Sequence, residues 1–238
     1  MNIPETLKIY SVSTVEVALL EIIERLKVTL DVVVDVQFHT APQLARKDLI
    51  LDDIDLLITT QSMISQLVEK EILEKSSVIE LGQTEVALCT YNTSPLPEVF
   101  TVEDFFKLMI RCDEILLTEG SSGLYVQSLF RDLEFKTSLE KKYKRFATGR
   151  EMLTYLGQFC RHSNSNAWIV GLGANTEILQ FESIGIKYLS GLPQELKHTT
   201  TYSIGMTTHT KRSDPANQFM NHLRLSQNWT LFKISGFK

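Results

Sequence analysis

The feature that most constrains the fold is an alternation of strand-like and helical stretches over residues 7–70. Three stretches have the short, alternating or β-branched pattern of strands, and each precedes a stretch with helical apolar spacing. The order β-α-β-α-β-α is typical of a mostly parallel sheet with helices on its faces. The predicted strands are Leu7–Val12, Asp31–Phe38 and Asp55–Thr59, and the predicted helical stretches are Val15–Leu26, a helix and loop around Leu44–Leu51, and Ser62–Lys70.

A second α/β series is expected in the middle of the chain. Its predicted strands are Glu85–Thr90, Glu114–Thr118 and Ala167–Val170; its helices are Val102–Ile110, a helix opening after Gly120-Ser-Ser-Gly123 and another at Gly149–Cys160; Asn92–Pro97 is rich in turn residues. The chain then ends with a strand, Thr200–Met206, and an amphipathic helix, Pro215–Leu225. We therefore predict two lobes, each a mostly parallel sheet flanked by helices: residues 1–84 with 205–238, and residues 85–204. Two crossovers, near 84–90 and 199–205, would form the hinge.

Composition sets limits on partners. With 238 residues, 43% of them hydrophobic, the chain can bury one large core or two smaller ones. The net charge of −5 does not favour nucleic acid as a partner. A basic run from Lys136 to Arg145 lacks aromatic interleaving beyond Tyr143, and we interpret it as a solvated helix end or loop.

Neither a membrane span nor a disulfide framework is indicated. No apolar stretch reaches the roughly 18 residues that a span needs. Residues 1–5 lead directly into a strand and carry no secretory signal. We therefore expect a periplasmic or cell-envelope protein if a leader was removed, and a cytoplasmic one if Met1 is the native start. The cysteines, Cys89, Cys112 and Cys160, have no paired spacing, and Cys89 should pack inside a strand.

Three loops combine hydroxyl groups with the passage from a strand to a helix. They are Ser11-Val-Ser13-Thr14, Thr40-Ala-Pro-Gln43 and Ser121-Ser122-Gly123. Free backbone N–H groups at a helix start, together with hydroxyls, attract anions. Each loop alone is most simply an N-cap or a turn. Because all three follow predicted parallel strands, whose carboxyl ends commonly form ligand sites, together they favour an anion site.

Other motifs are less specific. Gly171-Leu-Gly173 lacks the third glycine of a dinucleotide-binding fingerprint, and Gly120-Ser-Ser-Gly123 is not a nucleophile elbow. Cys160 and His162 have no second pair to complete a zinc site. The aspartates at 52, 53 and 55 are interpreted as a solvated loop with Asp55 at a strand start. We therefore predict no metal site and no cofactor.

Two stretches near the C-terminus match a family pattern. Leu192-Pro-Gln-Glu-Leu196 and Thr200-Thr-Tyr-Ser-Ile-Gly205 are similar to Leu-Pro-x-Glu-Leu and Thr-x-Tyr-Ser-x-Gly of the molybdate-type (ModA-like) periplasmic solute-binding proteins of ABC transporters. The resemblance runs nearly end to end, and the order and spacing of its motifs carry it. The other matching stretches are Leu7–Leu19, Phe38–Leu44, Ile54–Ile58, Ser121–Tyr125 and Thr176–Leu179.

The resemblance implies a two-lobed type II periplasmic-binding-protein-like fold that reversibly binds a small oxyanion or organic acid in the cleft between its lobes. We expect the anion to be held by Ser13, Thr14 and Thr40 from one lobe and by Ser122 and Gly123 from the other. Neutral hydroxyl and N–H donors suit a fully deprotonated anion. The chain departs from the family where a tyrosine contacts molybdate, because Ala174 stands there, and His39 is unusual for a neutral site. The expected ligand is therefore a small oxyanion or organic acid and not molybdate in particular.

Two alternatives stay open. An aconitate-isomerase-like enzyme would act on a di- or tricarboxylate in the same cleft, with His39 and Glu177 as the candidate general bases. A sensor or degenerate binding domain would have no transport partner. We favour binding over catalysis and assign no catalytic residue. The expected partners are a small anion and an ABC-transporter permease, without nucleic acid, and the expected state is a monomer.

Overall fold

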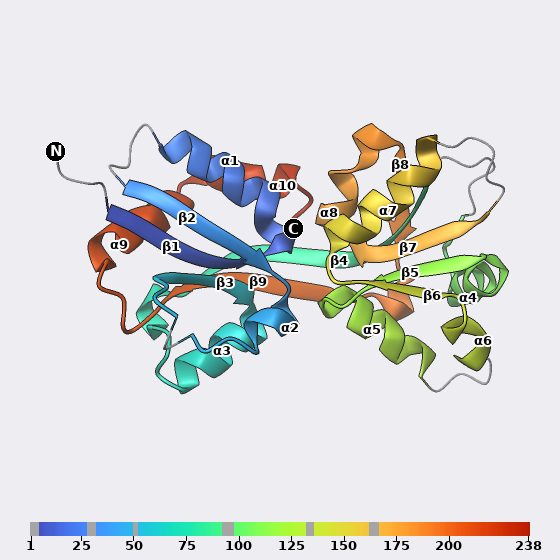
Figure 1. The fold of residues 1–238 in the computed structure, drawn as a ribbon, viewed down its shortest axis with the longest axis horizontal. Helices are drawn as coiled ribbons and strands as arrows, with labels where there is room; N and C mark the ends of the chain where they lie inside the picture. Colours follow the sequence, from blue (N-terminus) through green and yellow to red (C-terminus); the bar gives the residue numbers. More distant parts are fainter. Residues whose placement is uncertain (1–4, 28–31, 50–51, 92–97, 132–135, 162–166) are drawn as a thin grey trace. The chain divides into compact units, whose positions relative to one another are not determined.

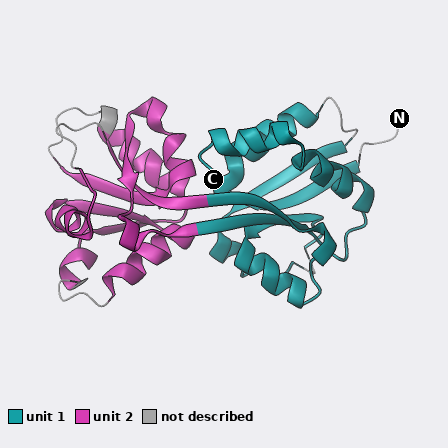
Figure 2. Cartoon of the chain, turned by 180° about the vertical axis from the view of Figure 1, so that it is seen from behind, with its two compact units in different colours: residues 1–83, 200–238 teal, residues 84–199 magenta. Residues whose placement is uncertain are grey.

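A computed structural model of the protein describes residues 5–27, 32–49, 52–91, 98–131, 136–161 and 167–238. The chain divides into two compact units, residues 1–83 with 200–238 (unit 1) and residues 84–199 (unit 2), shown in Figure 2. The boundaries fall inside strand β4 (Ile79–Tyr91) and at the start of strand β9 (Thr199–Met206). The chain therefore passes between the units twice, and both of its ends belong to unit 1.

Unit 1 is built on a sheet of order β2-β1-β3-β9 (Figure 1). Its first three strands are parallel, and β9 runs antiparallel to β3. Helices α1 and α10 contact each other on one side of the sheet, and α3 lies on the other. The remaining elements are β1 (Glu5–Val12), β2 (Val32–His39), β3 (Leu56–Thr60), α1 (Glu16–Leu26), α2 (Ala41–Leu44), α3 (Gln61–Glu69), α9 (Ser213–Leu223) and α10 (Ser226–Ile234).

Apolar spacing explains how unit 1 packs. In α1, Leu19, Ile22 and Leu26 recur at helical spacing and are buried in the core. Strand β3 lies inside the sheet, and its Leu56-Leu57-Ile58 run is buried on both faces. The edge strand β2 instead alternates, with Val34 and Val36 against the core. These apolar patterns account for the helices and strands, and the residues at the strand ends, which lie outside the patterns, form loops.

Unit 2 is built on a sheet of order β8-β4-β7-β5-β6. Strands β6 and β7 are parallel to β5, whereas β4 is antiparallel to β7 and β8. The elements of unit 2 besides β4 are β5 (Glu114–Thr118), β6 (Tyr143–Phe146), β7 (Ile169–Ala174), β8 (Ile186–Gly191), α4 (Val102–Arg111), α5 (Ser121–Phe130), α6 (Lys136–Glu140), α7 (Gly149–Arg161) and α8 (Asn175–Leu179).

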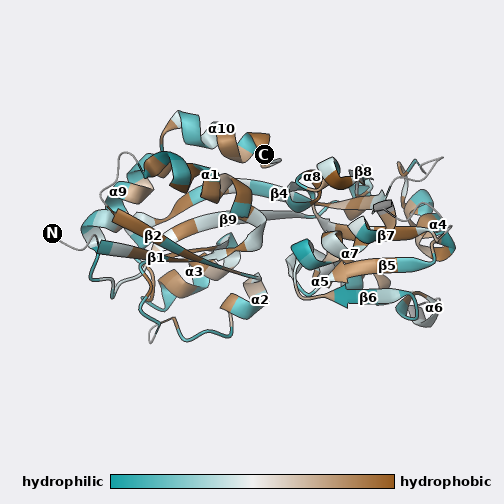
Figure 3. Ribbon diagram, turned by 45° about the horizontal axis from the view of Figure 1, so that its top comes forward, coloured by the Kyte–Doolittle hydropathy of each residue, from teal (hydrophilic) through white to brown (hydrophobic). Residues whose placement is uncertain are grey.

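The central strand β5 divides the core of unit 2 into two clusters. Ile115 and Leu117 pack with residues of α4 and α5, and Leu116 packs on the opposite face with residues of α7 and α8. Strands β5 and β7 are hydrophobic along most of their length, while β6 at the edge is hydrophilic (Figure 3). Helices therefore cover both faces of the sheet, as expected for buried parallel strands.

Several predicted elements differ from the structure. The helix and loop expected around Leu44–Leu51 begin earlier in the structure. The short helix α2 starts at Ala41, after the N-cap Thr40 and with Pro42 in its first turn, and it ends at Leu44. The strand expected at Ala167–Val170 instead begins at Ile169 and continues through two glycines to Ala174. The Gly120–Gly123 loop is shorter than expected, since α5 begins at Ser121. The turn-rich stretch 92–97 and His162 lie outside the described residues.

The interpretation of the basic run as a solvated helix end or loop holds for only part of it. Residues 136–140 form α6, whereas residues 143–145 of the run lie in the edge strand β6. Lys142 Nζ donates to carbonyl oxygens at the C-terminus of α4, among them Cys112 O at 2.8 Å. Lys144 Nζ lies 3.8 Å from the centre of the Tyr155 ring. The charge of Lys142 therefore interacts with the C-terminus of α4, and the charge of Lys144 interacts with the face of the Tyr155 ring. Within the described ranges, no helix combines the length and apolar character that crossing a membrane requires.

Candidate functional site

In unit 1 the carboxyl ends of β1 and β2 lie side by side. The two strands are parallel and in register, with Val12 opposite His39. The loops that follow therefore begin next to each other, and Ser13 Oγ donates to the His39 carbonyl at 3.3 Å. The structure thus brings together the loops that carry Ser13, Thr14 and Thr40.

Each of these hydroxyl groups has a partner within the protein. Thr40 forms a capping box with Gln43: its Oγ1 accepts from Gln43 N at 3.3 Å, and its N–H donates to Gln43 Oε1 at 2.8 Å. Thr14 Oγ1 lies 3.4 Å from Tyr202 Oη. The Thr40 hydroxyl accepts a hydrogen bond as a cap, so its own hydrogen can still be donated to a ligand.

The same edge of unit 1 contains two hydroxyl residues that were not predicted. Thr60 ends β3 and caps α3, accepting from Met63 N at 3.4 Å. Tyr202 lies opposite Thr60 on β9 and is buried. The rule applied to the other strand ends would have found Thr60, and Tyr202 belongs to the Thr-Tyr-Ser motif itself.

His39 lies in an aromatic and basic environment. Its ring packs edge-on against Tyr10 with centroids 5.3 Å apart, and Lys47 Nζ lies 4.4 Å from the centre of the Tyr10 ring. Its Nε2 is buried and has no hydrogen-bond partner among the described residues. Burial, followed by the charge of Lys47, lowers the pKa of His39, although Asp52 partly opposes this shift. A neutral imidazole is therefore favoured here.

In unit 2 the third predicted loop opens helix α5. Gly120, the N-cap residue, provides no side-chain cap for the first turn. The Ser122 hydroxyl lies 3.5 Å from Thr118 Oγ1. Gly123 is buried, and a Cβ at this position would lie 1.9 Å from Thr118 O. The glycine is thus required for the packing of α5 against its own preceding strand, whether or not a ligand approaches.

Three helices start at the same edge of the unit 2 sheet. Strands β6, β5 and β7 are parallel neighbours, and α7, α5 and α8 follow them. The start of α7 was predicted at Gly149, but its place at this edge was not, because β6 was not predicted. Thr148 caps α7, accepting from Glu151 N at 3.2 Å. Ala174 is the last residue of β7 and is buried.

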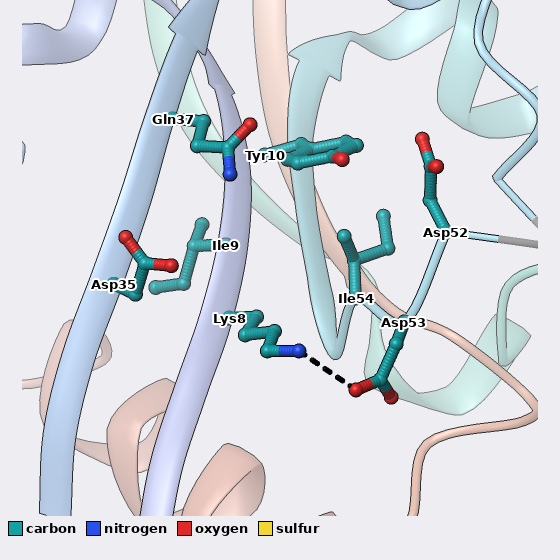
Figure 4. Close-up of a pocket in the computed structure, with 8 residues that line it drawn as sticks. All are labelled: Lys8, Ile9, Tyr10, Asp35, Gln37, Asp52, Asp53 and Ile54. Atoms are coloured by element: carbon teal, nitrogen blue, oxygen red, sulfur yellow. Dashed lines mark hydrogen bonds and ion pairs between the residues drawn. The ribbon is translucent and has the colours of Figure 1, made fainter.

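A pocket of about 260 Å³ lies elsewhere in unit 1, on the exposed side of β1 and β2 (Figure 4). Lys8 Nζ forms an ion pair with Asp53 Oδ2 at 2.8 Å on its rim. The five residues predicted to bind the ligand do not line this pocket, and with three aspartates and one lysine it does not suit an anion. Its lining residues are Lys8, Ile9, Tyr10, Asp35, Gln37, Asp52, Asp53 and Ile54.

The Asp55 carboxylate is buried and has its partners within unit 1. This carboxylate is fully buried, accepts from Lys8 N at 2.8 Å and pairs with Arg212 Nη1 at 3.0 Å. Arg212 also pairs with Asp53, and the guanidinium holds the pKa of Asp53 well below its usual range. The two aspartates thus join the start of β3 to the C-terminal part of unit 1. No cluster of three or more metal-ligating side chains occurs among the residues that the structure describes.

Comparison with known proteins identifies the class. The model of the family described as bacterial extracellular solute-binding protein matches residues 7–238. The chain belongs to this family, which confirms the resemblance inferred from the motifs. No curated protein sequence matches the chain.

Solved structures confirm the fold. The substrate-binding domain of a putative molybdenum ABC transporter from Clostridium difficile is 20% identical, with a TM-score of 0.69 over 98% of both chains. The periplasmic molybdate-binding protein of Azotobacter vinelandii is 12% identical, with a TM-score of 0.77 over 98% of both chains. The sulfate-binding protein SubI from Mycobacterium tuberculosis is 13% identical, with a TM-score of 0.73 over 98% of this chain and 86% of the other.

Proposed function

We propose that the protein reversibly binds a small anion, an oxyanion or an organic acid, and works with a membrane permease of an ABC transporter. The observation that carries this proposal is the gathering of helix starts and hydroxyl groups at the carboxyl ends of the parallel strands in each unit. Such edges present N–H and O–H donors without a fixed positive charge. The names of the similar structures, which mention molybdenum, molybdate and sulfate, support an anionic ligand.

We propose that one ligand draws on donors from both units: Ser13, Thr14 and Thr40 of unit 1, and Ser122 and Gly123 of unit 2. The first turn of α5 supports this assignment, because the N-cap Gly120 leaves it without a side-chain cap. Membership of a solute-binding family supports binding over the isomerase alternative. The two candidate bases of that alternative, His39 and Glu177, belong to different units.

The direct test is a thermal-shift screen over oxyanions and over di- and tricarboxylates. A ligand that binds only the folded chain raises its melting temperature as its concentration rises above Kd. We expect at least one small anion to stabilise the protein in a saturable way. If no anion does so while the protein is folded, small-anion binding is wrong.

A further inference from the structure

A carboxylate lies against the start of α7 in unit 2. A Cβ built on Gly149, the first residue of α7, would lie 2.2 Å from Glu177 Oε2 and 2.9 Å from Glu177 Oε1. Both oxygens thus occupy the space that any larger residue at position 149 would need. Glu177 is half-buried in the first turn of α8, so its side chain is held between two helices.

Two physical effects favour this placement. The first turn of a helix has unpaired N–H groups and a partial positive charge, which stabilise a nearby carboxylate. Glycine at position 149 lets the carboxylate come close to the backbone, because no side chain intervenes. Glu177 therefore supplies, from within the protein, the negative charge that a helix start could otherwise take from a ligand.

This carboxylate lies at the same edge of the unit 2 sheet as Ser122, the edge proposed above to bind the ligand. Strands β6 and β7, which lead to Gly149 and Glu177, flank β5, which leads to Ser122. Neighbouring strands lie about 4.8 Å apart, and α5 packs on one face of the sheet while α7 and α8 pack on the other, so the start of α5 is separated from the other two helix starts by on the order of 10 Å. At this separation charges still interact at moderate ionic strength. An anion held at the start of α5 would thus be influenced by the carboxylate of Glu177.

We propose that Glu177 determines ligand specificity, selecting a small organic acid that carries a hydroxyl or ammonium group over a bare tetrahedral oxyanion. This inference rests on the proposed function of the same site. A carboxylate accepts hydrogen bonds but cannot donate them, and it repels a second negative charge. A ligand meets both conditions when it directs a hydrogen-bond donor toward Glu177 and its negatively charged acid group toward the hydroxyl and N–H donors. A fully deprotonated oxyanion has no donor to offer.

The test compares Glu177→Gln with the unchanged protein. Affinities for molybdate, sulfate, malate, citrate and aspartate are measured by calorimetry. Glu182→Gln, which removes an exposed carboxylate of the same unit, is the matched control. Melting curves establish that each variant is folded, and Glu177→Ala replaces Glu177→Gln if the latter is not. We expect the unchanged protein to bind at least one hydroxy or amino acid roughly tenfold or more tightly than either oxyanion, since one charge-assisted contact has about this effect. Glu177→Gln should reduce or reverse this preference for the hydroxy or amino acid over the oxyanions, and Glu182→Gln should leave the preference unchanged.

Two results would overturn the inference in different ways. If the unchanged protein prefers molybdate or sulfate, or if Glu177→Gln alters the ratio no more than Glu182→Gln does, Glu177 does not set specificity, although anion binding itself stands. If no probe binds to the folded unchanged protein, the proposed function fails and this inference fails with it.

Discussion

Gly149 and Glu177 form a contact whose energetics can be measured at the level of single residues. Gly149→Ala places a methyl group where the Glu177 carboxylate lies, so this carboxylate must move away from the start of α7, and its loss there should lower the free energy of unfolding by on the order of 1 kcal/mol. In a Glu177→Ala background the carboxylate is absent, so Gly149→Ala should lower the free energy of unfolding by clearly less. The difference is measured by denaturant unfolding in a double-mutant cycle.

The control for this cycle is Gly191→Ala, because a Cβ at position 191 meets only Tyr188 Oη at 3.9 Å, an ordinary contact. If Gly149→Ala has equal effects with and without Glu177, the two residues are not in contact in solution.

The lowered pKa of His39 predicts a pH effect on stability. Its folded-state pKa lies below the unfolded value of 6.5, so the unfolded chain binds more protons in the interval between the two. The stabilisation is therefore complete above pH 6.5 and is lost as the pH falls through the folded-state pKa. The melting temperature of His39→Gln should fall less than that of the unchanged protein between about pH 7 and about pH 5. His198, whose pKa burial also lowers, contributes equally in both proteins. Parallel melting profiles would show that His39 titrates normally.

At the scale of elements, one arginine joins two parts of unit 1. Arg212, just before α9, pairs with Asp55 at the start of β3 and with Asp53 beside it. Arg212→Ala removes a cationic partner from a fully buried carboxylate and should lower the free energy of unfolding by about 3 kcal/mol. Arg212→Lys should recover only part of the loss, because lysine lacks the planar fork that reaches both aspartates.

Arg224→Ala is the comparison for this variant, since Arg224 is exposed and, among the described residues, its side chain is hydrogen-bonded to Asn221 alone. Denaturant unfolding measures the free energy of unfolding of Arg212→Ala, Arg212→Lys and Arg224→Ala. Equal stability of Arg212→Ala and Arg224→Ala would contradict an anchoring role for Arg212.

Elements with strong periodicity could be predicted from the sequence, and weakly patterned ones could not. Strand β5 was predicted with its bounds, because Ile115-Leu-Leu117 is buried on both faces and ends at turn residues. Strand β6 was missed, because Lys144 and Arg145 lie at an exposed sheet edge where no apolar pattern is needed.

The candidate site could be predicted in part for the same reason. The loops carrying Ser13, Thr40 and Ser122 follow strands that the sequence reveals. Gly149 follows β6, so its contact with Glu177 could not be found without the structure. Whether a hydroxyl caps its own helix or binds a ligand also depends on partners distant in sequence, as for Thr14 and Tyr202.

At the scale of the whole molecule, the central claim is that one small anion is held by donors from both units. A chain that passes twice between two compact units, each with helix starts at one sheet edge, supplies two sets of donors. A ligand that contacts both sets stabilises the arrangement in which both are engaged. Removing a donor from either unit should therefore weaken the same binding event.

The most direct measurement is calorimetric titration of Thr40→Ala and Ser122→Ala with the anion that stabilises the unchanged protein most. A lost charge-assisted hydrogen bond should reduce affinity by about tenfold or more, corresponding to roughly 1.5–3 kcal/mol, in both variants. If the two hydroxyls do not bind the ligand, loss of the Thr40 cap should instead lower stability by about 1 kcal/mol and leave affinity unchanged, and loss of the Ser122 hydroxyl, which caps no helix, should also leave affinity unchanged. Weaker binding in both variants is the result predicted here. Unchanged affinity in both, with earlier melting only, would contradict the claim.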